Sequence, residues 1–202
     1  MPSSSNKLIL ASRSPRRSEL LRSLGLEFTV SPSHVDEITD PDQSPEQNAT
    51  NIARDKARWV ARQNPGCHVL GADTMVVLGQ EIIGQPTDAE DAYRILSKLA
   101  GKQHRVITGV VLISPQAEEY ETAIVSTVSI KSVSENEIRS YIATGEPLDK
   151  AGAYAIQGEG AFLVESWEGS WSNIVGLPLE ALTDLFEHAG FPLPKNNDRN
   201  RK

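Results

Sequence analysis

Apolar and polar positions along the chain follow a pattern that predicts alternating strands and helices. Residues 8–12 (LILAS) and 68–78 (HVLGADTMVVL) are almost continuously apolar, which is typical of buried strands. Further strands are expected at residues 27–33, 104–114, 120–133 and in the second half of 151–169. Helices are expected over residues 15–24, 50–64, 87–101, 134–145 and 178–190. This alternation predicts an α/β fold, in which the polar residues 36–48 form a loop.

Capping residues support two of these helices. Ser14 is placed to cap the first helix, Pro15 fits its first position and Gly25 is expected to end it. Ser134 and Glu137 have the spacing of a capping box before residues 135–145. These two helices are therefore predicted by their end signals as well as by their apolar residues.

The composition limits the partners that the chain is expected to bind. A formal net charge of −7 and an isoelectric point near 5.2 argue against nucleic acid or an anionic membrane, since both attract basic surfaces. Cys67 is the only cysteine, so no internal disulfide can form and a cytoplasmic, reducing location is expected. The polar N-terminus does not resemble a signal peptide, and no segment has the ~20 apolar residues of a membrane span.

The length bounds the domain organisation. A chain of 202 residues with 39% apolar residues fits one domain, either undivided or with two lobes. No internal repeat or low-complexity linker marks a domain boundary. The polar tail at residues 194–202 lacks the apolar residues needed for packing and is expected to be disordered.

Two adjacent arginines at the start of the first helix are unexpected in an acidic chain. Arg16 and Arg17 fall in the first turn, where positive charge opposes the helix dipole unless an anion binds there. A helix N-terminus after a Ser-rich turn already favours phosphate, and arginine binds phosphate oxygens in a bidentate manner. The two arginines therefore point to a phosphate site, with a solvated surface pair as the alternative.

Further charges occur at apolar positions. Lys56 lies within the apolar stripe of its helix, between Ile52 and Trp59, so it either extends outward to solvent or lines an anion site. Asp73 interrupts the buried strand at 68–78, where a carboxylate needs a partner or a metal, unless it ends the strand in a turn. Glu37, in the loop before Lys56, is a second candidate acidic ligand on weaker grounds.

These cations and carboxylates are typical of phosphate chemistry with a hard divalent metal. The familiar phosphate signatures GxxxxGK[ST] and GxGxxG are missing, as are HExxH and paired CxxC motifs for zinc. The chain also offers no support for a Ser-His-Asp hydrolase beyond scattered residues. The sequence pattern alone thus favours a phosphate site of an uncommon kind.

Several blocks in order closely resemble the Maf family of nucleoside triphosphate pyrophosphatases, once named septum formation inhibitors. They are LILASRSPRRSELLRSLGLEF, ARDKA, VLGADTMVVL, PTDAEDAYRIL, GEPLDKAGAYAIQG and GSWSNIVGLPL, which together span roughly residues 7–190. The resemblance implies a two-lobed, mixed-sheet α/β fold similar to inosine triphosphate pyrophosphatases, with the nucleotide in a cleft between the lobes. Residues 1–193 are then expected to form a single domain with two lobes. The implied reaction is metal-dependent and cytosolic, and it releases a nucleoside monophosphate and pyrophosphate.

The resemblance also implies roles for individual residues. Asp73 matches the catalytic acidic residue, and Glu37 with Asp73 matches the positions expected to hold a divalent cation, Mg²⁺ or Mn²⁺. The residues expected to contact phosphate or substrate are Ser12, Arg16, Arg17 and Lys56. The residues linked to base choice are Arg16, Thr74 and Gln157.

The block DKAGAYAIQG resembles the subgroup that acts on dTTP and UTP. Gln85 departs from that subgroup, which commonly has a lysine before this proline, so one phosphate-side cation is missing. Two alternatives stay open: the same chemistry on another base such as 7-methyl-GTP, and a cell-division inhibitor that acts by binding a partner. Relatives are often homodimers, so a homodimer is the expected assembly.

Overall fold

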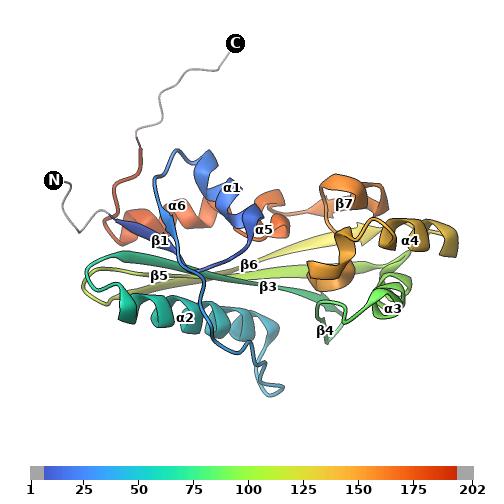
Figure 1. The fold of residues 1–202 in the computed structure, drawn as a ribbon, viewed down its shortest axis with the longest axis horizontal. Helices are drawn as coiled ribbons and strands as arrows, with labels where there is room; N and C mark the ends of the chain where they lie inside the picture. The colour runs from blue at the N-terminus through green and yellow to red at the C-terminus, as the bar shows by residue number, and fades with distance from the viewer. Residues whose placement is uncertain (1–6, 195–202) are drawn as a thin grey trace, which may run out of the picture.

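The computed structural model describes residues 7–194, and the tail expected to be disordered lies outside this range except for its first residue. One mixed sheet has the strand order β2-β1-β3-β5-β6-β7, with β4 on β3 (Figure 1). Its strands are β1 (Leu8–Leu10), β2 (Thr29–Val30), β3 (His68–Leu78), β4 (Glu81–Ile83), β5 (Gln103–Ile113), β6 (Glu119–Ile130) and β7 (Val164–Glu168). β1 is parallel to β2 and β3, while the other pairs are antiparallel. The predicted α/β class with a mixed sheet is confirmed.

Helices cover both faces of this sheet (Figure 1). The α-helices are α1 (Pro15–Ser23), α2 (Pro45–Gln63), α3 (Ala89–Leu99), α4 (Glu135–Ile142), α5 (Trp171–Val175) and α6 (Leu179–His188). The 3-10 helices are η2 (Glu146–Asp149), η3 (Ala151–Ala153) and η4 (Gly158–Leu163). α2 covers one face alone, and α1, α5 and α6 lie on the other. Within residues 7–194, no helix combines the length and the apolar character required to span a membrane.

The second helix begins earlier than its apolar pattern predicts. α2 starts at Pro45, so the loop expected at 36–48 ends about one helical turn sooner. The Ser44 side chain accepts a hydrogen bond from the Gln47 backbone N–H, and the Gln47 side-chain oxygen accepts one from the Ser44 backbone N–H, which completes a capping box. A polar first turn with a good cap therefore extends the helix without apolar contacts. β2 is shorter than the expected strand at 27–33 and pairs only through Thr29 and Val30.

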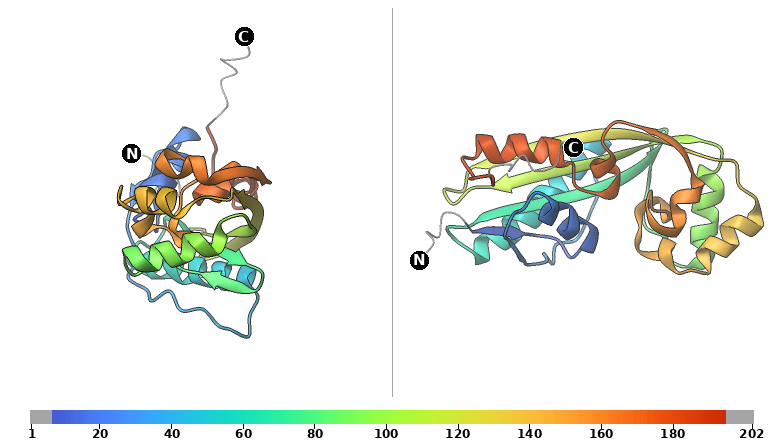
Figure 2. Two further views of the ribbon diagram at one scale, coloured as in Figure 1. Left: turned by 90° about the vertical axis from the view of Figure 1, so that its right-hand side faces the viewer. Right: turned by 90° about the horizontal axis from the view of Figure 1, so that it is seen from above.

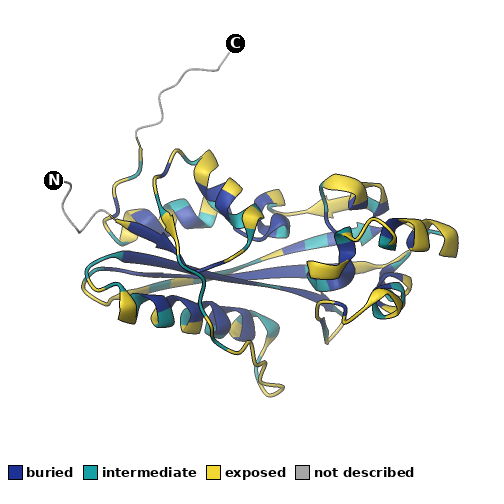
Figure 3. Cartoon of the chain, viewed as in Figure 1, coloured by how far each residue is buried: buried dark blue, intermediate teal, exposed yellow. Residues whose placement is uncertain are grey.

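The long strands β3, β5 and β6 connect two packed regions (Figure 2). At one end, α1 and α6 pack on Leu70, Val110 and Leu112. At the other end, α3, α4 and the 3-10 helices pack on a separate set that includes Val76 and Val106. The buried strands between them form the centre of the molecule, as the dark strands in Figure 3 show.

Helix α2 lies unusually close to the sheet. A Cβ at Gly71 would be 2.2 Å from the Ala53 carbonyl oxygen, and one at Gly109 would be 2.4 Å from the Thr50 nitrogen. These two glycines, on β3 and β5, therefore permit backbone contact that any side chain would prevent. The close contact brings Lys56, on the inner face of α2, within reach of β3.

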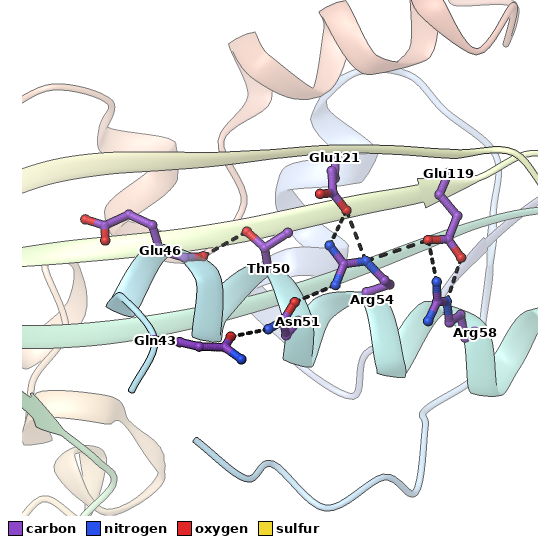
Figure 4. Close-up of polar contacts among 8 residues, drawn as sticks. All are labelled: Gln43, Glu46, Thr50, Asn51, Arg54, Arg58, Glu119 and Glu121. Atoms are coloured by element: carbon purple, nitrogen blue, oxygen red, sulfur yellow. Dashed lines mark hydrogen bonds and ion pairs between the residues drawn. The ribbon is translucent and has the colours of Figure 1, made fainter. Parts of the chain in front are cut away.

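Ion pairs fasten the outer side of α2 to the start of β6 (Figure 4). Arg54 contacts Glu121 at 2.5 Å, and Arg58 contacts Glu119 at 2.6 Å. Arg54 also lies 3.6 Å from Glu119, so the two arginines share that carboxylate. Exposed pairs of this kind contribute little energy individually. The apolar residues of α2, including Ala53, Ala57 and Val60, pack on the sheet and set which side of the helix faces it.

The edge of β3 has a gap in its pairing. β1 pairs with β3 only as far as Leu70, and β4 pairs with β3 only from Val76 onward. Asp73 and Thr74 lie between these points, with β5 as their partner on the other side. Because successive side chains of a strand point to opposite faces, Asp73 and Thr74 face opposite sides of the sheet at this gap.

Candidate active site

A cleft of about 910 Å³ opens at this gap in the sheet edge. Its walls come from the segment after β1 and the start of α1, the segment after β2, the inner face of α2, the middle of β3, β4 and residues 149–157. The site residues that the sequence predicted all line it: Ser12, Arg16, Arg17, Glu37, Lys56, Asp73, Thr74 and Gln157. The structure therefore brings together residues, such as Ser12 and Gln157, that are separated by more than two thirds of the chain.

Lys56 lies between two carboxylates. Its Nζ is 2.7 Å from Asp73 Oδ1 and 2.7 Å from Glu37 Oε1. Lys56 is 7% exposed and Asp73 is 6% exposed, so this pair is buried, whereas the Glu37 side chain is largely exposed. The alternative of an outward-pointing lysine is therefore wrong. Asp73 lies in the middle of β3, so the alternative of an aspartate in a strand-end turn is also wrong.

The surroundings of Asp73 act on its pKa in opposite directions. Burial raises the pKa of Asp73 above its usual value, while the charges of Lys56 and Arg17 oppose this effect. When the cation that pairs with a buried carboxylate moves away, only the effect of burial remains. The carboxylate then binds a proton more readily than an exposed carboxylate does. Asp73 is thus suited to accept a proton inside the cleft.

Arg17 is anchored by hydrogen bonds to three parts of the chain. Its Nε donates to the Gly176 carbonyl at 2.8 Å, Nη1 to Ser12 Oγ at 3.2 Å and Nη2 to Thr74 Oγ1 at 3.0 Å. Burial lowers the pKa of Arg17, which nevertheless stays charged near neutral pH. These bonds use three of the five N–H groups of a guanidinium, so two remain to bind an anion.

Arg17 is therefore not a solvated surface arginine, and that alternative is wrong for this residue. Arg16, its neighbour, is half-buried at the mouth of the cleft. Burial raises the pKa of Asp149, but its contact with Lys150 and the charge of Arg16 outweigh burial and lower that pKa below its usual value. Arg16 thus acts electrostatically on another residue of the cleft lining.

The N-terminus of α1 faces the cleft. Ser14 caps the helix by accepting a hydrogen bond from the Arg17 backbone N–H at 3.4 Å, as predicted. Ser12 Oγ accepts from the Ser14 backbone N–H at 3.2 Å as well as from Arg17. Backbone N–H groups at a helix N-terminus and two arginines make this end of the cleft attractive to an anion.

The cleft is also lined by Gln85, Lys150 and Gln157. Lys150 is buried, and its Nζ contacts Asp149 Oδ1 at 2.6 Å and the Glu146 carbonyl oxygen at 2.5 Å. Lys150 is therefore a second buried cation of the cleft, held by its own local partners. Gln85 contributes a neutral amide to the cleft lining.

The sequence did not single out Thr108, which extends the Arg17 contacts. Thr108 is fully buried on β5, directly opposite Thr74 on β3, and the two hydroxyl oxygens are 2.9 Å apart. Thr108 donates to the Asn173 carbonyl at 3.2 Å, so Thr74 donates to Thr108 and accepts from Arg17. A polar residue in an otherwise apolar strand, opposite another threonine, was the signal that could have identified it.

Glu37 and Asp73 are the carboxylates of the cleft that could hold a divalent cation. The oxygens of Glu37 and Asp73 converge on one point, where they both contact Lys56. Among the described residues, no group of three or more His, Cys, Asp or Glu side chains could hold a metal. Two converging carboxylates suit Mg²⁺ or Mn²⁺ only if other oxygens complete the shell, as substrate phosphates commonly do.

Almost the whole described chain is similar in sequence to known proteins. Residues 7–189 match the family described as Maf-like protein. A dTTP/UTP pyrophosphatase of Myxococcus xanthus is 50% identical over 188 residues, covering 93% of this chain and 94% of that protein. A dTTP/UTP pyrophosphatase of Caldicellulosiruptor saccharolyticus is 45% identical over 194 residues, covering 94% of this chain and 98% of that protein.

Among solved structures, the chain is similar to a dITP/XTP pyrophosphatase of Mycobacterium abscessus. The two share 21% identity and a TM-score of 0.41, over 61% of this chain and 74% of the other. The Staphylococcus aureus Ham1 protein gives 12% identity and a TM-score of 0.44, over 78% and 79%. The family match and the relatives at 45–50% identity are decisive, and the chain belongs to the Maf family.

Proposed function

We propose that this chain is a nucleoside triphosphate pyrophosphatase that hydrolyses dTTP and UTP to the monophosphate and pyrophosphate. The observation that carries the proposal is the buried Lys56 between Glu37 and Asp73, in a cleft that also contains Arg17. Relatives at 45–50% identity bear the name dTTP/UTP pyrophosphatase, which supports the same reaction and bases. The proposed setting is the cytoplasm, and a homodimer is the proposed assembly.

The triphosphate binds across the α1 end of the cleft in this proposal. Arg17 offers its two remaining N–H groups in a fixed orientation, because its other three are bonded to protein. Arg16 adds charge at the mouth, and Ser12 holds the turn that presents the helix N-terminus. Positioning and charge neutralisation of this kind supply most of the catalysis in phosphate transfer.

Lys56 connects substrate binding with proton transfer. In the free protein its ammonium group is shared by Glu37 and Asp73. Phosphate oxygens in the cleft compete for this ammonium group, so substrate binding weakens its hold on Asp73. Asp73, whose pKa burial raises, then accepts a proton from the attacking water. Lys56 and the arginines stabilise the negative charge that develops on the departing pyrophosphate.

A divalent cation, Mg²⁺ or Mn²⁺, would be held by Glu37 and Asp73 together with phosphate oxygens. When bound, it supplies charge neutralisation at the phosphates. Gln157 lines the cleft, and its amide can pair with the imide edge of thymine or uracil. Thr74 is placed to orient Arg17 through its hydroxyl, which makes its part in base choice indirect.

A nucleotide panel tests the proposal. The full chain is incubated with dTTP, UTP, CTP, GTP and 7-methyl-GTP in Mg²⁺ or Mn²⁺, and the products are separated as pyrophosphate or orthophosphate. We expect pyrophosphate release, with the highest kcat/KM for dTTP and UTP. Release of orthophosphate would contradict the reaction, and a preference for 7-methyl-GTP would contradict the substrate. Absence of turnover on the whole panel would favour a binding protein.

A further inference from the structure

The segment that carries Gln157 is held from outside the cleft. Tyr141 on α4 and Glu146 on η2 are not among the residues that line the cleft. Both nevertheless bond to backbone groups on either side of Gln157. The Ala155 N–H donates to Tyr141 Oη at 3.3 Å on one side of it. The Glu159 and Gly160 N–H groups donate to Glu146 at 3.2 and 2.8 Å on the other.

Tyr141 and Glu146 are themselves joined. Tyr141 Oη donates to Glu146 Oε2 at 2.7 Å, so the phenol both accepts from Ala155 and donates to the carboxylate. Hydrogen bonds from Tyr141 and the two backbone N–H groups lower the pKa of Glu146, and they outweigh the opposing effect of burial. Glu146 is thus ionised at neutral pH and accepts hydrogen bonds only, as this geometry requires.

Two glycines show how closely the segment fits these side chains. Gly158 has a φ of +75°, and a Cβ there would be 2.3 Å from Glu146 Oε1. A Cβ at Gly160 would be 2.4 Å from Tyr141 Oη. Glu146 also accepts a hydrogen bond from Lys150 Nζ through its carbonyl oxygen, so the same residue orients a buried cation of the cleft.

We propose that Tyr141 and Glu146 are positioning residues for base selection, because their joined hydrogen bonds fix both flanks of Gln157. This inference rests on the proposed function. It assigns part of the base discrimination to Tyr141 and Glu146, which do not line the cleft. If Gln157 is displaced, its amide cannot pair with the imide edge of the base. Such misplacement lowers kcat/KM for the preferred base. In the proposed function the phosphates bind at Arg16, Arg17 and the N-terminus of α1. None of these groups is hydrogen-bonded to Tyr141 or Glu146, so phosphate binding should be independent of this pair.

The test variant is Tyr141→Phe, which removes the hydroxyl and keeps the ring that packs against Phe162. We expect the KM for dTTP and UTP to rise about tenfold or more and the preference for dTTP over CTP to fall by a similar factor. Competitive inhibition by inorganic tripolyphosphate, which has no base, should be unchanged. The matched control is Tyr120→Phe, which removes a 2.9 Å hydrogen bond to Glu118 far from the cleft. It should behave as wild type.

Glu146→Gln is the second variant, and it decides the question if Tyr141→Phe does not fold. The glutamine side chain has one carbonyl oxygen, which cannot accept from the Tyr141 hydroxyl and both backbone N–H groups, those of residues 159 and 160. The same loss of base preference is therefore expected. An unchanged dTTP/CTP preference in folded variants would overturn the inference, as would an equal loss of tripolyphosphate inhibition. Failure of the proposed function would appear instead in the wild type, as no pyrophosphate release. In that case, equilibrium binding of dTTP and CTP gives the same comparison.

Discussion

Lys56 is the common partner of two carboxylates, and this shared contact decides what substitutions at either position should do. A lysine in an apolar stripe and an aspartate in an apolar strand were each ambiguous in the sequence, because one charge alone does not reveal its partner. The spacing of Lys56 and Asp73 along the sequence could not show that they pair, because one lies on a helix and the other on a strand. Their contact depends on how that helix packs on the sheet. The structure shows that the two charges are partners, with Lys56 Nζ 2.7 Å from Asp73 Oδ1.

Asp73→Asn should retain the fold and lose nearly all turnover. Asn fills the same volume and keeps one acceptor for Lys56, but it cannot take a proton from water. The loss of a general base alone lowers kcat by about 10²–10⁴-fold. Turnover is measured with dTTP and compared with Asp55→Asn, the same change on the exposed side of α2. A folded Asp73→Asn protein within a few-fold of wild-type activity would rule out the catalytic role.

Lys56→Met should destabilise the free protein. From the sequence alone, an unpaired inward lysine predicts unchanged or higher stability with methionine, which fits an apolar stripe. The ion pair reverses this expectation, because the substitution leaves Asp73 buried without its closest partner. Breaking a buried pair on one side lowers the free energy of unfolding by about 3 kcal/mol.

Urea unfolding measures this loss, and Lys98→Met is the control because it removes an ion pair with Glu81 at the protein surface. We also expect Lys56→Met to raise the KM for dTTP about tenfold, since a charge-assisted contact to phosphate is lost. Stability equal to that of Lys98→Met would show that the Lys56–Asp73 pair contributes nothing.

At the scale of elements, the apolar pattern was sufficient for the long strands and for most helices, but it missed two short elements. β3, β5, β6 and five of the α-helices, α1 to α4 and α6, follow from apolar periodicity and capping residues. β4 and α5 were missed because three and five residues are too few to show a period. The gap in the edge of β3 could not be predicted from the sequence either, because it depends on where the short strands β1 and β4 end.

Gly71→Ala should move α2 and disturb the site without touching it. Its Cβ would fall 2.2 Å from the Ala53 carbonyl oxygen, so helix and sheet must separate and Lys56 moves away from Asp73. Overpacking of this kind lowers the free energy of unfolding by about 1–3 kcal/mol. Urea unfolding and dTTP turnover should therefore both decline.

Gly84→Ala is the stability control for this prediction, because nothing lies within 4 Å of the added Cβ and its φ is not positive. Wild-type stability in Gly71→Ala would mean that α2 can shift freely. The connection between close helix packing and the Lys56–Asp73 contact would then be wrong.

At the scale of the whole molecule, one buried histidine should influence the pH dependence of unfolding. His104 on β5 is 2% exposed and bonds through Nε2 to the Tyr154 hydroxyl at 2.8 Å. Burial lowers the pKa of His104 to about 4, so the folded protein keeps this imidazole neutral. The unfolded chain takes up the proton near pH 6.5, so stability falls as the pH is lowered from about 6.5 to 4.

His104→Gln keeps a group that can bond Tyr154 and removes the titration. We expect it to abolish about 3 kcal/mol of the loss in unfolding free energy between pH 6.5 and 4. The measurement is urea unfolding at several pH values, with the exposed His188→Gln as control. An identical pH profile in His104→Gln and wild type would contradict the buried neutral state.

The three long strands that run through both packed regions have a consequence for how such proteins can be modified by recombination. β3, β5 and β6 contribute residues to the packing at both ends, so no cut leaves either part with a complete sheet. Exchange of one packed region between relatives would therefore divide these strands, whereas single substitutions in the cleft leave them whole.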